Sequence, residues 1–343
     1  MYYLSKSEEE VFAQATKTLL KSVLQEVQRI ECKYCRSRNI VHFGQSKGIK
    51  QYYCNSCHRK FAANGALPGM KTSTDIIAGA LNCYYGGMSL YNIANNIKQQ
   101  TDKDFTEVGI KNWINRFTRA ALSKTSGLHP NVGPVWIVNE CELDVGDKVW
   151  YRDVIDMDTS FLLATYLSED RTMEDASQVL RKAVRTAGKD PETVVTDLLG
   201  VYIEGIKNVF GHAVQHITPD NYESSDLSRR KMKHWNLLAR RRIDILRRLD
   251  SPAKSKLLLN GFMFDHNYLR PRDDLENSAP AEKAGIQSPY KYWTDVITKS
   301  WTPVESHAAE TLKERPYYFK IDRRNLPDIP QSASEGQTEK EKR

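Results

Sequence analysis

The sequence predicts an α/β protein in which a cysteine-rich ribbon and a helical segment precede a larger domain built on a mixed β-sheet. Three observations support this order. Two Cys-x-x-Cys pairs lie near the N-terminus, three short helical patterns follow, and strand patterns alternate with helix patterns from residue 135 onward. The chain has 343 residues, more than one hydrophobic core organises comfortably, so we expect several domains.

Composition excludes two broad classes of protein. Hydrophobic residues make up 40% and charged residues 27%, which suits folded domains and excludes a wholly disordered chain. No apolar run approaches the roughly 18 residues that a membrane span needs, and the N-terminus lacks the layout of a signal peptide. We therefore expect a cytoplasmic protein with no membrane partner.

The net charge of +7 is too small to name a partner, but its distribution is informative. Between residues 229 and 248 one acid, Asp244, stands against nine basic residues, a density typical of polyanion binding. These basic residues are Arg229, Arg230, Lys231, Lys233, Arg240, Arg241, Arg242, Arg247 and Arg248. Before them in the chain, residues 7–30 of the N-terminal segment 1–30 predict one amphipathic helix, either packed on its own protein or forming a dimer interface.

The most specific metal signal is the pair Cys32/Cys35 followed by the pair Cys54/Cys57. Two such knuckles bring four thiolates to the corners of a tetrahedron around Zn²⁺, and the spacer is long enough for a hairpin. We expect residues 31–66 to form a zinc ribbon with structural Zn²⁺; a redox dithiol is the alternative. The ribbon is basic, which leaves both DNA contact and a purely solubilising role open.

The three helical patterns between residues 72 and 121 suit a helix-turn-helix domain over residues 70–122. Gly86 and Gly87 end the first helix, and Ser89 and Thr106 are N-caps for the second and third. The third would be the recognition helix, whose polar side chains could reach bases or phosphates: Lys111, Asn112, Asn115, Arg116 and Arg119. A three-helix bundle that binds nothing is the alternative.

Residues 123–134 carry two glycines and two prolines and predict a linker. The following domain, residues 135–288, begins with strand patterns over 135–143, 149–157 and 161–167, an antiparallel meander. Helix 172–187, strand 193–196, helix 201–210 and strand 213–217 come next, the order of an RNase H-like α/β domain. In that arrangement a residue midway along the first strand meets one at the end of the fourth.

At this point the chain resembles the DDE transposases of prokaryotic insertion sequences, over about residues 32–288. The most specific motifs are Leu258-Leu-Asn-Gly-Phe262, His266-Asn-Tyr-Leu-Arg-Pro271 and Ala279-Pro-Ala-Glu-Lys-Ala-Gly-Ile286. The resemblance implies duplex DNA as partner, including inverted repeats at transposon ends, and a homodimer. It also implies three carboxylates that hold two Mg²⁺ or Mn²⁺ ions for polynucleotidyl transfer.

Here the sequence departs from the family pattern. The resemblance places the triad at Asn139, Asp197 and Lys233, so two of three carboxylates are replaced. Unit charges 4 Å apart at an effective dielectric constant of 20 interact by about 4 kcal/mol, so a divalent ion facing an ammonium group would meet roughly 8 kcal/mol of repulsion. We hypothesise that Lys233 replaces the metal and pairs with Asp197, leaving a catalytically inactive protein that binds transposon-end or regulatory DNA.

Two other functions stay open. An active transposase could use Mg²⁺ or Mn²⁺ with displaced acids, for which Glu140, Asp144, Glu223 and Asp226 are candidates; strand alternation puts Glu140 on the face opposite Asn139. A zinc-ribbon module that binds protein is the third possibility. Residues 289–330 form an aromatic-containing extension without a motif, and residues 331–343 predict a disordered tail. If DNA is the partner, we expect association with the nucleoid.

Overall fold

The computed structural model describes residues 30–144, 148–196, 200–217 and 252–301. These residues divide into two compact units, one with residues 30–42 and 53–61 and the other with residues 43–52 and 62–301. The N-terminal helical pattern, the basic stretch 229–248 and the C-terminal tail lie outside the described residues. No helix among the described residues is long and apolar enough to cross a bilayer.

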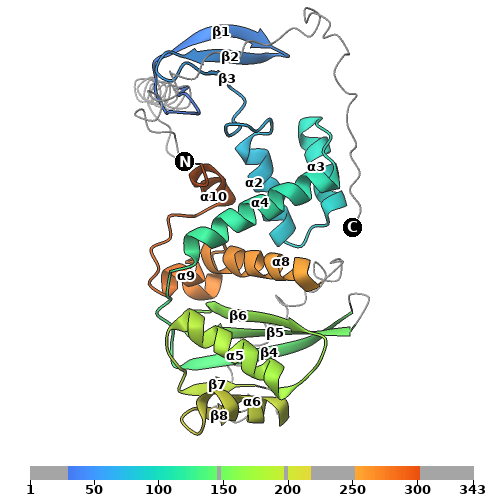
Figure 1. The fold of residues 1–343 in the computed structure, drawn as a ribbon, viewed down its shortest axis with the longest axis vertical. Coiled ribbons are helices and arrows are strands. Elements are labelled where there is room, and N and C mark those ends of the chain that lie inside the picture. Colours follow the sequence, from blue (N-terminus) through green and yellow to red (C-terminus); the bar gives the residue numbers. More distant parts are fainter. Residues whose placement is uncertain (1–29, 145–147, 197–199, 218–251, 302–343) are drawn as a thin grey trace, which may run out of the picture. The chain divides into compact units, whose positions relative to one another are not determined.

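The N-terminal region contains a three-stranded sheet in the order β1-β2-β3 (Figure 1). Strands β1 (Ile40–Ser46) and β2 (Ile49–Cys54) confirm the predicted hairpin. Lys47 and Gly48 connect them, both with positive φ, as a two-residue hairpin turn of type I′ requires. Strand β3 (Lys60–Ala62) was not predicted, because three residues are too short for an alternating pattern.

Three helices follow: α2 (Thr74–Tyr85), α3 (Leu90–Thr101) and α4 (Glu107–Thr125). The predicted caps are confirmed, since the side chain of Ser89 accepts a hydrogen bond from Asn92 N and that of Thr106 accepts one from Gly109 N. The apolar positions predicted from the helical spacing form a shared core, including Ile77, Leu81, Ile93, Ile110, Ile114 and Phe117.

The predicted linker, residues 123–134, begins too early. Helix α4 continues to Thr125, so the boundary drawn after residue 122 cuts its last turn. The extension has a physical reason, because no glycine or proline lies between Gly109 and Gly127 and the buried Ala121 still packs in the core.

A five-stranded sheet forms the centre of the following domain, in the order β6-β5-β4-β7-β8. Strands β4 (Val135–Asp144), β5 (Lys148–Asp156) and β6 (Leu162–Ser168) form the predicted antiparallel meander. Strands β7 (Thr193–Val195) and β8 (Gln215–Ile217) add in parallel beside β4. The first and fourth strands of this domain are therefore neighbours, as predicted, and the strand order is that of an RNase H-like domain.

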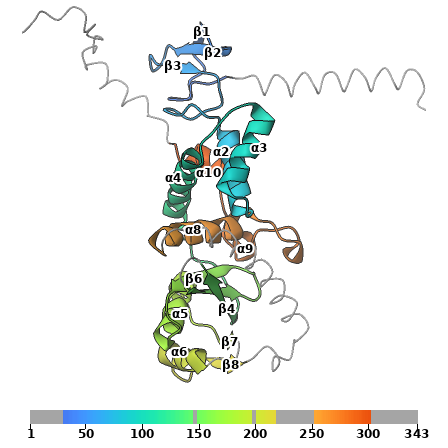
Figure 2. The same ribbon diagram turned by 90° about the vertical axis from the view of Figure 1, so that its right-hand side faces the viewer.

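Two helices lie along one face of this sheet, and a third lies beside the edge strand β6, as Figures 1 and 2 show. Helices α5 (Met173–Ala187) and α6 (Gly200–Phe210) pack on one face, where Trp136 and Val138 join their apolar side chains. Helix α8 (Pro252–Phe264) lies beside β6, and its Phe262 and Met263 pack on the other face of the sheet with Ile137 and Val195. Alternate residues of β4 thus point to different helices.

Helix α8 also packs against the three-helix segment. A Cβ added at Gly261 would lie 2.2 Å from Tyr85 Oη and 2.5 Å from Thr118 Cγ2, so only glycine permits this approach. Those two side chains also bond to each other, with 2.6 Å between Tyr85 Oη and Thr118 Oγ1. Helix α10 (Trp293–Lys299) completes the contact, because the Trp293 ring stacks on Tyr85 at 5.3 Å.

Candidate functional site

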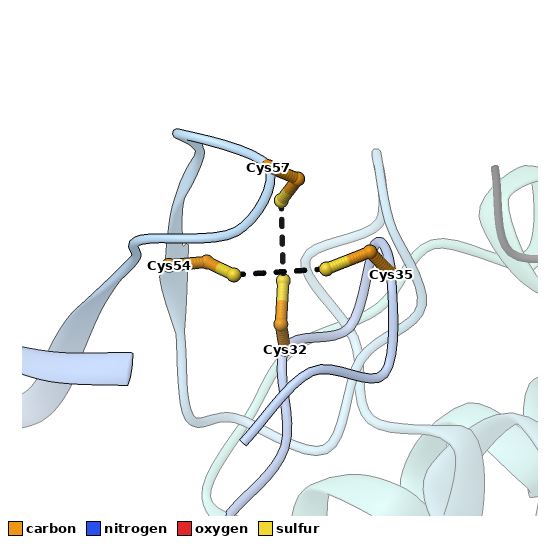
Figure 3. A group of neighbouring side chains, drawn as sticks. All are labelled: Cys32, Cys35, Cys54 and Cys57. Atoms are coloured by element: carbon orange, nitrogen blue, oxygen red, sulfur yellow. Dashed lines mark hydrogen bonds between the residues drawn. The ribbon is translucent and has the colours of Figure 1, made fainter. Parts of the chain in front are cut away.

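The four cysteines predicted as metal ligands come together at the base of the ribbon (Figure 3). Their sulfur atoms all lie within 4.8 Å of one another, and the Sγ atoms of Cys32 and Cys57, and of Cys35 and Cys54, are 3.6 Å apart. Tetrahedral Zn²⁺ with 2.3 Å bonds would hold its sulfur ligands about 3.8 Å apart. The donor set and the spacing therefore fit Zn²⁺.

The two halves of this cluster repeat the same backbone geometry. In each, the first cysteine donates its N–H to the carbonyl five residues later, Cys32 to Ser37 and Cys54 to Arg59. The residue after each second cysteine, Arg36 or His58, has a positive φ. Because both Cys-x-x-Cys loops have this geometry, they direct all four thiols toward the same point. Among the described residues, no other group of three or more His, Cys, Asp or Glu side chains lies close enough to share an ion.

The thiols differ in acidity. Burial raises the pKa of Cys54, but hydrogen bonds from the backbone N–H groups of Cys57 and Ser56 and from the neighbouring thiols outweigh it and lower that pKa to about 7. Burial and the neighbouring thiols raise the pKa of Cys57. A cluster of this kind needs a cation before all four sulfur atoms can be thiolates at neutral pH.

On the face of the sheet under α8, Asn139 is the predicted triad position that the structure describes. It lies on β4 directly opposite Asp153 on β5, and both side chains are buried. Asn139 Nδ2 donates to Asp153 Oδ1 at 3.1 Å. Thr165 stands next to Asp153 on β6 and donates its Oγ1 hydrogen to Met263 Sδ of α8 at 3.2 Å. These three side chains form a polar row across three strands.

The other two triad positions, Asp197 and Lys233, lie outside the described residues, as do Arg229, Arg230, Lys231, Arg240, Arg241 and Arg242. The structure therefore does not test whether the three predicted triad residues lie close together. Strands β4 and β7 are parallel neighbours, and Ile137 of β4 pairs with Val195 of β7. Val195 is the last residue of β7, and Asp197 follows it by two residues in the sequence. Directly after β7, Thr196 Oγ1 bonds with His216 Nε2 at 2.8 Å, and burial lowers the pKa of His216.

Glu140 points away from this row, which confirms the prediction from strand alternation. Its carboxylate, 4% exposed, binds the guanidinium group of the fully buried Arg152 at 2.7 Å and also pairs with Arg171. Tyr202 of α6 donates its hydroxyl hydrogen to the same carboxylate at 3.0 Å. Burial, followed by the charge of Glu140, raises the pKa of Tyr202. Glu140 is thus committed to an ion-pair network that joins β4, β5 and α6.

The candidate DNA-binding residues of α4 do not share one level of exposure. Asn112, Arg116 and Arg119 are exposed, whereas Lys111 and Asn115 are half-buried along the flank of the helix. The Arg116 guanidinium lies 5.4 Å from the ring centre of Phe117. The helix therefore presents cations and an amide on its outer side while Ile110 and Ile114 pack inward.

The closing motifs that looked most family-specific act as a clamp on the sheet. The side-chain amide of Asn267 accepts from Leu162 N at 2.8 Å and donates to Leu162 O at 2.9 Å, near the point where the β5–β6 pairing shifts register. His266 Nε2 donates to the carbonyl of Ser160, a residue with positive φ. Both residues belong to the π-helix η2 (Asp265–Leu269). They hold the β5–β6 turn against the end of α8.

The comparison with protein families gives this architecture its identity. Residues 134–270, from the start of β4 to the end of the clamp, match a family model described as DDE domain, of the IS240 group of transposases. Residues 134–270 thus resemble a DDE domain. No curated protein matches the chain.

Solved structures of retroviral integrases are similar to part of the chain. The HTLV-2 integrase catalytic core domain in complex with magnesium is 16% identical, with a TM-score of 0.33, and the match covers 46% of this chain and 98% of that one. The catalytic core domain of BIV integrase is 12% identical, with a TM-score of 0.32, covering 44% and 93%. The integrase in the simian T-cell lymphotropic virus intasome is 15% identical over 62% of each chain, with a TM-score of 0.30.

Sequence reasoning missed two parts of the DDE domain. Asp153 was not named as a candidate. In the observed β4–β5 hairpin it lies directly opposite Asn139, on the same face of the sheet. The register of that hairpin depends on the length of its turn, which the sequence pattern did not settle. The clamp role of His266 and Asn267 was also missed, because no periodicity signals a side chain that bonds to backbone 105 residues away.

Proposed function

We propose that this chain is a transposase-derived protein that binds duplex DNA and does not catalyse strand transfer. The observation that carries the proposal is the pairing of Asn139 with Asp153. With aspartate at 139, two buried carboxylates would face each other at about 3 Å and would need a cation or a proton between them. The amide of Asn139 donates a hydrogen bond instead, which supports a site that does not require an ion at this position.

Divalent metal ions fit this donor set poorly. Mg²⁺ and Mn²⁺ take hard oxygen ligands, and paired ions need clustered carboxylates to offset their charge. Position 139 offers an amide, and the family pattern places Lys233 at the third position, where an ammonium group would repel a cation. Asp197 would remain as the one acid of the triad. We therefore infer that Lys233 substitutes for the metal ions.

An active enzyme with a displaced acid is the second candidate, and Asp153 is the residue that favours it. Its carboxylate is beside the usual ligand position and on the same face of the sheet. Of the acids considered from the sequence, Glu140 faces the other way and is held by Arg152 and Arg171. Complete burial of Asp153 beneath α8 argues against this candidate, because ions and DNA phosphate need access.

DNA binding is supported by charge. Arg116 and Arg119 are exposed on α4, and the stretch 229–248 adds nine basic residues against one acid. Neutralised phosphates release counterions, so the affinity for DNA should fall steeply with salt concentration. We further propose structural Zn²⁺ in the ribbon, a homodimer and, as DNA targets, the inverted repeats of a transposon end.

Two assays on the zinc-loaded full chain test the proposal. Gel shifts on duplex DNA at 50 and 200 mM salt should show binding that weakens strongly with salt. Nicking and strand-transfer assays with Mg²⁺ or Mn²⁺ should give no product. Product formation that is abolished by Asp153→Asn would establish the second candidate, and salt-insensitive behaviour without DNA binding would favour a protein-interaction module.

A further inference from the structure

The first turns of α4 carry a stripe in which an exposed apolar side chain is followed by one exposed amide, one half-buried amide and a half-buried lysine. Val108 is 68% exposed and is followed at i+3, i+4 and i+7 by Lys111, Asn112 and Asn115. An exposed valine is unremarkable alone. Its alignment with Asn112, one helical turn later on the same side, is the informative feature.

The stripe is held rigidly with respect to the rest of the bundle. On the opposite side of α4, Ile110 and Ile114 are at most 1% exposed and pack against α2 and α3. Thr106 caps the helix at its N-terminus, and Asp102, with positive φ, ends the preceding helix. These contacts present the N-terminal half of α4 as a preformed surface, which reduces the entropic cost of binding.

The spacing matches what a helix in the major groove uses to read bases. Recognition helices contact base edges from positions separated by three, four and seven residues near their N-terminal half. Asparagine bonds to the N6 and N7 edge of adenine, and an apolar side chain packs on the methyl group of thymine. Arg116 and Arg119, further along α4, are exposed cations suited to flanking phosphates.

We propose that Val108 and Asn112 read adjacent A·T base pairs in the major groove, with Val108 against a thymine methyl group and Asn112 on an adenine. This inference rests on the proposed binding of duplex DNA and specifies which bases that surface selects. Lys111 and Asn115 flank the two readers, and Arg116 and Arg119 set the register on the backbone.

The test begins with selection of binding sites by the full zinc-loaded chain from a pool of random duplex DNA. Each thymine of the selected site is then replaced in turn by deoxyuridine, which removes only the methyl group. For the wild-type chain, one such replacement should weaken binding about threefold to fivefold, the effect of one buried methyl-sized group. The Val108→Ala chain should bind the thymine-containing site about threefold to fivefold less tightly than the wild-type chain does. Its affinity should not change when that thymine is replaced by deoxyuridine.

Three further variants separate base reading from general effects. Asn112→Ala should lose about tenfold discrimination between A·T and G·C at the neighbouring pair. Arg119→Ala should weaken binding to all sequences alike and reduce the salt slope by about one. Ile203→Ala, at an exposed apolar residue on α6 of the DDE domain, is the matched control and should keep the full response to deoxyuridine.

The outcomes distinguish this inference from the proposed function. Salt-sensitive DNA binding in which no thymine methyl matters, or in which Val108→Ala retains the wild-type response, overturns the base-reading role and leaves DNA binding intact. Failure to select or bind any duplex overturns both. Because Val108 is exposed, circular dichroism should show the same melting temperature for Val108→Ala and the wild-type chain, so lost binding cannot be attributed to unfolding.

Discussion

Asn139 and Asp153 face each other across the β4–β5 pair, and the amide of Asn139 donates a 3.1 Å hydrogen bond to the carboxylate of Asp153. The resemblance to DDE transposases places the first acid of the family pattern at the position of Asn139. We propose that asparagine at this position offers Asp153 a neutral hydrogen-bond donor, where a second acid would require a cation or a proton between the two carboxylates.

Asn139→Asp should destabilise the chain by about 2 kcal/mol at pH 8, because it replaces a hydrogen bond with facing carboxylates. One carboxyl group should then hold its proton to a higher pH in the folded state than in the unfolded state. The stability of the variant should be greatest at low pH and should be lost as the pH rises through that raised pKa. Thermal melts at pH 5.5 and pH 8 check this. The double variant Asn139→Asp, Asp153→Asn again places one amide opposite one acid. It should therefore recover most of the stability that the single variant loses, and a double variant as unstable as the single one would refute the pairing.

Glu140→Gln should cost about 3 to 5 kcal/mol, because it leaves Arg152, fully buried, without its carboxylate partner. Urea unfolding at pH 7 measures the loss. Glu142→Gln is the matched control, since Glu142 is on the same strand and face but is exposed. Equal effects of the two variants would contradict a structural role for the Glu140 network.

Gly261→Ala should destabilise the contact between α8 and the three-helix segment by about 1 to 3 kcal/mol, as expected for overpacking. The new Cβ would lie 2.2 Å from Tyr85 Oη, so adding Tyr85→Phe should relieve part of the cost. Gly79→Ala, within α2 and with no atom near the added Cβ, should instead stabilise the chain by about 0.5 to 1 kcal/mol. The signs of the two changes in melting temperature test the packing directly.

Zinc removal should unfold the ribbon and leave the DDE domain folded. Cys35→Ser, or treatment with a strong chelator, should release one zinc per chain, and amide signals from β1 and β2 should lose dispersion in NMR spectra. Cys83→Ser and Cys141→Ser alter cysteines outside the cluster and should retain the metal. Zinc retained by the Cys35 variant would show that the four thiols are not its ligands.

Local signals were enough to predict much of this fold. The two Cys-x-x-Cys pairs identified the cluster because tetrahedral coordination imposes their spacing. The caps Ser89 and Thr106 marked helix starts because each side chain satisfies a free backbone N–H group. The meander followed from β-branched runs separated by turn residues, and the element order then indicated which strands are neighbours.

Features that depend on distant partners were not predictable. Asp153 meets Asn139 only through the register of a hairpin, and Asn267 bonds to Leu162 from 105 residues away. Trp293 lies in the extension in which no sequence motif was found; it stacks on Tyr85, and its Nε1 donates to Asp265 at 2.9 Å. Such contacts leave no periodic trace in the sequence, because they are made once and between separate elements.

Calorimetric titration of the zinc-loaded chain with Mn²⁺ tests the loss of the catalytic metal site most directly. The wild-type chain should show no specific uptake beyond the zinc, whereas Asn139→Asp combined with Lys233→Glu should bind Mn²⁺ at a defined site, because three acids would again be available. Stoichiometric Mn²⁺ binding by the wild-type chain, sensitive to Asp197→Asn, would contradict the account.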